Sequence, residues 1–159
     1  MSIMVVDRLE LTIKYPGRLE EILLAGGYII SENNGKDKFN HQLPLLREKA
    51  NTVEKLEFQI FDFSHGLQIR DQAAVESMRT IGCRPATLAE ALILGIKYFE
   101  IKKNFSGIVI GDVWTDTFGF RTGQQIIIGK EKHLNLYGLD ATDNKWAIYP
   151  VVAVSKGNR

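Results

Sequence analysis

The chain has 159 residues, of which 45% are hydrophobic and 25% charged, a composition that argues against disorder over most of its length. Twenty basic and nineteen acidic residues leave a net charge of +1, so no overall field attracts the protein to nucleic acid or to an anionic membrane. The only cysteine is Cys83, which excludes a disulfide framework and a multi-cysteine metal site.

No stretch approaches the ~18 apolar residues of a membrane span, and no signal sequence is recognisable. We therefore expect a cytoplasmic protein that makes no membrane contact, and we do not expect it to bind nucleic acid. Its oligomeric state is left open by the sequence.

The first part of the chain predicts one strand and one short helix. Residues 5–15 alternate in the manner of a strand, and residues 18–25 form an apolar helix that ends at Gly26 and Gly27. Residues 31–55 are polar and rich in turn formers, which indicates a long connection. We therefore divide the chain into an N-terminal element with its connection, residues 1–55, and a main unit, residues 56–159.

The main unit begins with a strand over 56–63, followed by a helix over 69–81 that Gly82 closes. A capping box, Thr87 to Glu90, starts a second helix. Its core-facing stripe follows helical spacing, whereas Glu90 is expected on the solvent side. The residues of the stripe are Leu88, Ala91, Leu92, Gly95, Ile96 and Phe99.

After Asn104 the sequence breaks into short runs rich in β-branched and aromatic residues, separated by glycines. Such runs favour strands joined by tight turns, and we expect four of them. The fold class is therefore α+β, with one strand, two helices and a mostly antiparallel sheet of several strands in the main unit.

Three motifs give a resemblance. R-P-A-T-L-x-E lies at 84–90, V-x-G-x-x-W at 109–114, and an apolar strand ending in lysine at 151–156. They are similar to those of a group of short uncharacterised bacterial and prophage-associated proteins, for which we know of no established activity. The order of elements over 56–157 resembles the C-type-lectin-like fold, and the resemblance implies that architecture.

Calcium-dependent lectins hold their ion and sugar with E-P-N or Q-P-D motifs and a W-N-D triplet. In the corresponding region this chain has only Asp143-Asn144-Lys145-Trp146, and a lysine beside the would-be ligands opposes cation binding. Isolated histidines and a cysteine with no apparent base give no catalytic or metal motif. We predict no cofactor, no metal and no catalytic residue.

Aromatic and arginine side chains gather in 112–149, and such side chains dominate binding hot spots. The leading hypothesis is a non-enzymatic module that binds a protein partner with this face. Strand aromatics usually pack inward, however, which favours a core position for Trp114 and Trp146. The predicted binding residues are Trp114, Asp116, Phe118, Phe120, Arg121, Asn135, Tyr137, Asp143 and Trp146. We expect Phe118, Phe120 and Arg121 to be exposed in a glycine-bounded loop.

Two alternatives remain. The chain could be a small enzyme or a sensor of a nucleotide or other small ligand, using carboxylates of the same face for acid–base work or cation binding. These carboxylates are Asp112, Asp116, Asp140 and Asp143. In the other alternative, the connection 31–55 makes the contact with the partner.

Overall fold

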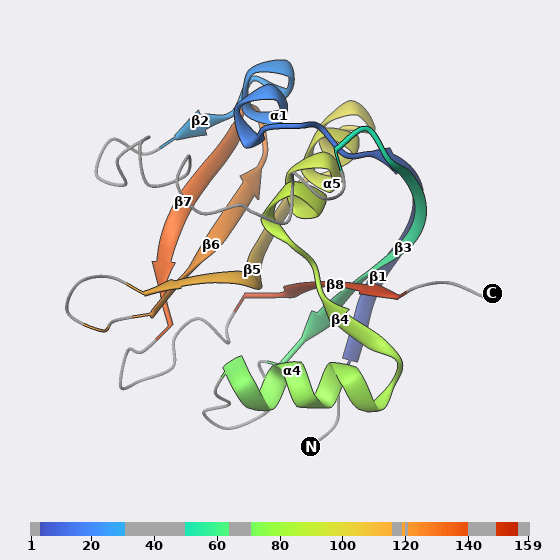
Figure 1. Cartoon of the computed structure of the whole chain (residues 1–159), viewed down its shortest axis with the longest axis vertical. Coiled ribbons are helices and arrows are strands. Elements are labelled where there is room, and N and C mark those ends of the chain that lie inside the picture. Colours follow the sequence, from blue (N-terminus) through green and yellow to red (C-terminus); the bar gives the residue numbers. More distant parts are fainter. Residues whose placement is uncertain are drawn as a thin grey trace.

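A computed structural model describes residues 4–30, 50–63, 71–115, 119, 121–139 and 149–155 (Figure 1). These residues form three helices and one eight-stranded, mostly antiparallel sheet. The predicted α+β class is confirmed at this level. None of the helices in the described part of the chain combines the length and the apolar character needed to cross a bilayer.

The sheet runs in the order β1-β3-β8-β5-β6-β7-β2, and the short β4 pairs with β8 beside this path. Neighbours are antiparallel, except that β5 meets β8 and β2 meets β7 in parallel. The strands are β1 (Met4–Lys14), β2 (Ile29–Ile30), β3 (Val53–Asp62), β4 (Cys83–Pro85), β5 (Phe105–Thr115), β6 (Arg121–Ile128), β7 (Lys132–Gly138) and β8 (Val151–Ser155).

The N-terminal segment is built into the same sheet as the rest of the chain. β1 pairs with β3 from Met4 opposite Asp62 to Lys14 opposite Val53. Helix α1 (Leu19–Gly26) ends at Gly27 in the left-handed conformation, as predicted, and it packs against α5. Residues 4–30, which we expected to form an element apart from 56–159, therefore share one sheet and one core with it.

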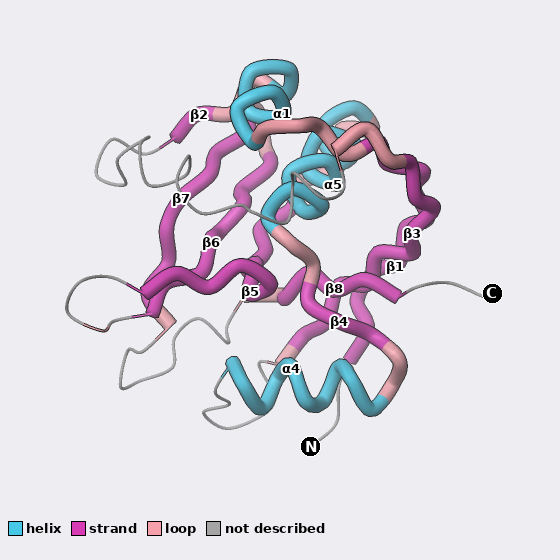
Figure 2. The backbone as a smooth tube through the Cα atoms, viewed as in Figure 1, coloured by secondary structure: helices cyan, strands magenta, loops and turns pink. Residues whose placement is uncertain are grey.

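Helix α5 (Leu88–Glu100) lies in the middle of the molecule with α1 beside it, whereas α4 (Asp71–Thr80) lies beyond β8 and β4 (Figure 1). The strands curve around α5 in the tube view (Figure 2). Because sheet and α1 enclose it, α5 buries more than the predicted stripe. The expectation that Glu90 faces solvent is wrong, since Glu90 is 0% exposed.

Alternation along the strands places two hydrophobic clusters on the two faces of the sheet. On β3, Phe58 and Ile60 belong to the cluster around α5, whereas Phe61 belongs to the cluster under α4. β8 divides in the same way, with Val152 facing α5 and Val151 facing α4. A strand covered on both faces reads as an unbroken apolar run, which explains the sequence Val151 to Val154.

The predicted helix over 69–81 is observed as α4, and Gly82 follows it with φ 78°. Cys83 begins β4 and is buried, which agrees with a packing role. The four strands expected after Asn104 are β5, β6, β7 and β8. The short strands β2 and β4 were not predicted.

Candidate binding site at the end of β5, β6 and β7

Three strand ends meet at one edge of the sheet. The last residue of β5, Thr115, lies opposite the first residue of β6, Arg121, and Thr122 of β6 lies opposite Gly138 at the end of β7. The backbone N–H of Leu139 continues the ladder by donating to the Arg121 carbonyl over 3.0 Å. The end of β5, the start of β6 and the end of β7 therefore adjoin one another.

An ion pair ties this edge to helix α4. The Arg121 guanidinium donates from Nη1 to Oδ2 of Asp71 over 2.9 Å, and from Nη2 to Oδ1 of the same carboxylate. The side chain of Asp71 is 6% exposed and that of Arg121 is 26% exposed. A planar two-bond contact of this kind fixes orientation as well as charge, so α4 and the start of β6 are held together.

Gln124 occupies an irregular stretch of the β5–β6 pairing. The register shifts between Val109 and Trp114, and Gln124 fills the gap by donating from Nε2 to the Asp112 carbonyl over 2.6 Å. Its side chain is fully buried, and its Oε1 has no hydrogen-bond partner in the described part of the structure. The bulge redirects β5 toward the edge that carries Trp114 and Thr115.

Asp112 links the same bulge to α5. Its Oδ2 accepts the backbone N–H of Leu88 over 2.7 Å, at the positive end of the helix dipole. Burial raises the pKa of the Asp112 carboxyl, and the Leu88 N–H offsets part of that effect. Gly111 permits the close approach, because a Cβ there would strike the carbonyl oxygen of Ala86.

Behind this contact, Glu90 is enclosed by four donors. Arg84 donates to Oε1 over 2.8 Å and to Oε2 over 2.7 Å, the Thr87 N–H donates to Oε1 over 2.9 Å, and the Tyr15 hydroxyl donates to Oε2 over 2.5 Å. Burial raises the pKa of Glu90, but the contacts from Arg84, Tyr15 and Thr87 together outweigh it and leave that pKa below its usual value. Each oxygen already accepts two bonds, so this carboxylate serves the fold.

These contacts explain the residues of the R-P-A-T-L-x-E motif. The Thr87 hydroxyl accepts the Glu90 N–H over 3.3 Å, and Glu90 returns the bond, so the predicted capping box is confirmed. Arg84 supplies the counter-charge, and Ala86 packs fully buried beside Gly111. The motif therefore fastens the start of α5 to β4 and β5.

The predicted binding residues fall into two groups. The first group lies where the three strand ends meet. Trp114 is next to the last residue of β5, Arg121 is the first residue of β6, and Tyr137 lies opposite Gly123 near the end of β7. Asn135 lies farther along β7, opposite Gln125. Asp116, Phe118, Phe120, Asp143 and Trp146 lie outside the described residues, as do the side chains of Trp114 and Tyr137.

Arg121 differs from its expected setting, because it lies within a strand, partly buried against Asp71. Sequence reasoning missed Asp71 and Gln124 altogether. Asp71 gave no local signal, since its partner is 50 residues away. Gln124 did give one, because two glutamines stand directly before the apolar run Ile126 to Ile128.

Comparison of the chain with protein-family models, curated proteins and solved structures found no match. Within the described residues, no group of three or more His, Cys, Asp or Glu side chains is arranged to hold a metal ion.

Proposed function

We propose that the protein is a non-enzymatic, cytoplasmic module that binds a protein partner through the edge formed by the ends of β5, β6 and β7. The observation that carries the proposal is the register that places Trp114, Arg121 and Tyr137 on adjoining strand ends. In the sequence, Phe118 and Phe120 stand among the five residues between the last residue of β5 and the first residue of β6.

The frame of this edge supports the proposal. Aromatic and arginine anchors bind well when their backbone is fixed before the partner arrives, since less entropy is then lost on association. The Arg121–Asp71 ion pair and the Gln124–Asp112 hydrogen bond hold β6 against α4 and against β5. Binding residues on a loop between such strands are carried by a rigid scaffold.

Affinity capture tests the proposal with three versions of the full chain: wild type, a Phe118→Ala/Phe120→Ala variant and a Leu24→Ala control. Leu24 is 82% exposed on α1, so its loss removes surface apolar area elsewhere. The wild type and the control should retain the same protein from a host lysate, and the double variant should lose it. Equal retention by all three versions would refute the proposal.

Arg121 is unsuitable as the first test, because removing it would also leave the buried Asp71 carboxylate without its cation. A loss of binding in Arg121→Ala could then reflect a displaced α4. The two phenylalanines allow the binding role to be separated from that structural role.

One observation favours a second function, a sensor or enzyme for a small ligand. Asp112 holds a partly buried carboxylate of raised pKa beside the start of α5, and Asp116, Asp140 and Asp143 share its segment of the chain. A thermal-shift screen with divalent metals and nucleotides tests it, because a ligand at 100 times its Kd adds about 2.7 kcal/mol to stability. A screen in which no compound raises the melting temperature would count against this function.

The C-type-lectin-like assignment and the prophage association are also proposals. The order β3, α4, α5 and then β5 to β8 supports the first, together with the R-P-A-T-L-x-E and V-x-G-x-x-W motifs. An experimental structure with a different order of elements would contradict it. Mobile-element genes beside the coding gene would support the second, and a setting among unrelated metabolic genes would contradict it.

A further inference from the structure

In the described part of the chain, no strand pairs with the outer edge of β1. β1 is the terminal strand of the sheet, and β3 is the one strand that pairs with it in the described residues. An edge strand carries unpaired backbone N–H and C=O groups that can template another strand. At eleven residues, β1 is long for such an edge.

The hydrogen bonds next to β1 show which of its residues face outward. Tyr15 donates to the Thr52 carbonyl and accepts from the Asn51 N–H, so its backbone groups point toward the β3 side. Backbone direction alternates along a strand, so Lys14, Thr12 and Glu10 direct their N–H and C=O groups outward. Their side chains are exposed as well.

The first half of the edge is blocked. The register shifts between Val5 and Asp7, and the Asp7 carboxylate accepts the Arg8 N–H over 2.9 Å. The other oxygen of Asp7 accepts from Tyr98 and from Lys103, both over 2.7 Å, which fixes the carboxylate in place. A bulge and a charged cover are devices that keep an edge from pairing, and they stop before Glu10.

The charges on β1 favour one register for pairing the β1 strands of two copies of the chain. In an antiparallel pair centred on Thr12, Glu10 of each copy lies opposite Lys14 of the other, which gives two attractive pairs. Centring on Leu11 would oppose Arg8 to Lys14, and centring on Glu10 would oppose two glutamates. Centring on Leu9 would require the Arg8 N–H to leave Asp7.

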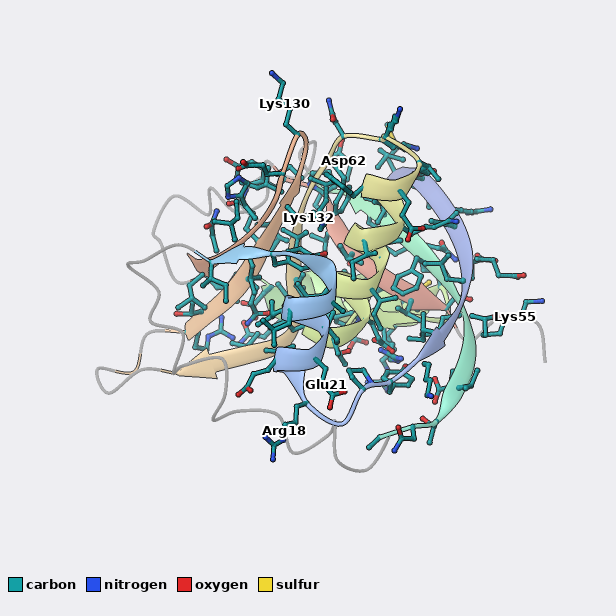
Figure 3. The ribbon with its side chains drawn as sticks, turned by 90° about the horizontal axis from the view of Figure 1, so that it is seen from above. Arg18, Glu21, Lys55, Asp62, Lys130 and Lys132 are labelled. Carbon is teal, nitrogen blue, oxygen red and sulfur yellow. The ribbon has the colours of Figure 1, made fainter. Side chains whose placement is uncertain are left out.

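We propose that two copies of this chain associate through β1, antiparallel and centred on Thr12, so that their sheets become continuous. The pairing forms about six backbone hydrogen bonds from Glu10, Thr12 and Lys14. Leu11, which is partly buried on the α5 side, then lies opposite Ile13 of the second copy. Glu10 already contacts Lys55 of β3 over 3.0 Å, and in Figure 3 Lys55 projects away from the molecule.

A proline at the centre of the edge gives the first test. Thr12→Pro removes an outward N–H without removing a bond to β3, so the fold of the single chain is retained. Light scattering of the wild type should give twice the 18.0 kDa of one chain at high concentration, and Thr12→Pro should give the single mass with an unchanged circular dichroism spectrum. A wild type that stays monomeric, or a variant that dimerises equally well, would overturn the proposal.

Charge exchange gives a test that does not depend on proline. Glu10→Lys and Lys14→Glu each place like charges opposite one another twice, which should weaken the dimer about tenfold. The variant with both changes restores opposite charges and should regain dimerisation. If the double variant is as weak as the singles, the register is wrong.

Crosslinking tests whether Thr12 lies at the centre of the paired β1 strands. Cys83 is buried and is the only native cysteine, so a Thr12→Cys chain presents one exposed thiol. Residues at the axis of such a pair lie about 5.5 Å apart between Cα atoms, within disulfide range. Mild oxidation should join Thr12→Cys chains and leave a Leu24→Cys control unjoined. Equal crosslinking of the two would mean random collision and would refute the pairing.

Discussion

Replacing Arg84 by methionine should destabilise the fold, because it leaves the buried Glu90 carboxylate at the start of α5 without its counter-charge. Glu90 is 0% exposed, and Arg84 gives it two of its four hydrogen bonds. Removing one partner of a buried ion pair costs about 3–5 kcal/mol, and we expect about 3 kcal/mol because the Arg84 side chain is 33% exposed. Urea denaturation near neutral pH measures this loss.

The stability of the wild type and that of Arg84→Met should change with pH in opposite directions. In the wild type the Glu90 pKa lies below its ordinary value of 4.5, so the stabilisation is present above that pH and is lost as pH falls through the folded pKa. Without Arg84, burial dominates and the folded pKa rises above the unfolded one. The variant should therefore gain stability on acidification, whereas the wild type loses it. The difference in free energy of unfolding between the two should narrow below about pH 5.

The matched control is Glu90→Gln, which leaves a partly exposed arginine that can still reach water. It should cost less than Arg84→Met, about 1–2 kcal/mol, and the double variant should cost less than the sum of the two. A loss below about 1 kcal/mol for Arg84→Met, or a stability gap that does not change with pH, would refute this account of the motif.

Three further sets of substitutions test the contacts that hold α4, α5 and β5 in place. Thr87→Ala should cost about 1 kcal/mol through the lost helix cap, and Thr87→Ser should restore it; an equal loss in both would contradict the capping role. Gly111→Ala should lower stability by about 1–3 kcal/mol, while Gly129→Ala, where a Cβ meets nothing within 4 Å, should be nearly neutral in the same melts. Arg121→Ala and Asp71→Asn should be coupled in a double-mutant cycle and should speed amide exchange in α4; additive effects would rule out the ion pair as its anchor.

Much of the local structure could be predicted because its causes lie within a few residues. The Thr87–Glu90 capping box and the left-handed glycines at 27 and 82 are adjacent to the helices they bound. The apolar runs after Asn104 marked the four later strands. β2 and β4 were missed because two or three residues carry too little periodicity to stand out.

The remaining features depend on residues far apart in the chain. No local pattern indicates that β1 pairs with β3, or that Asp71 meets Arg121. Glu90 was expected to face solvent because the helix pattern shows one apolar stripe. Its Arg84 and Thr87 donors lie in the same motif, but the Tyr15 hydroxyl comes from 75 residues away. Burial of a charge follows from its partners, which the sequence alone does not bring together.

Hydrogen–deuterium exchange, with and without the partner that the wild-type chain captures, tests the central claim most directly. The account predicts that binding slows exchange at 114–115, 121–123 and 137–139, where β5, β6 and β7 end, and leaves α1 unchanged. Protection confined to α1 and β2, with no change at the three strand ends, would contradict it.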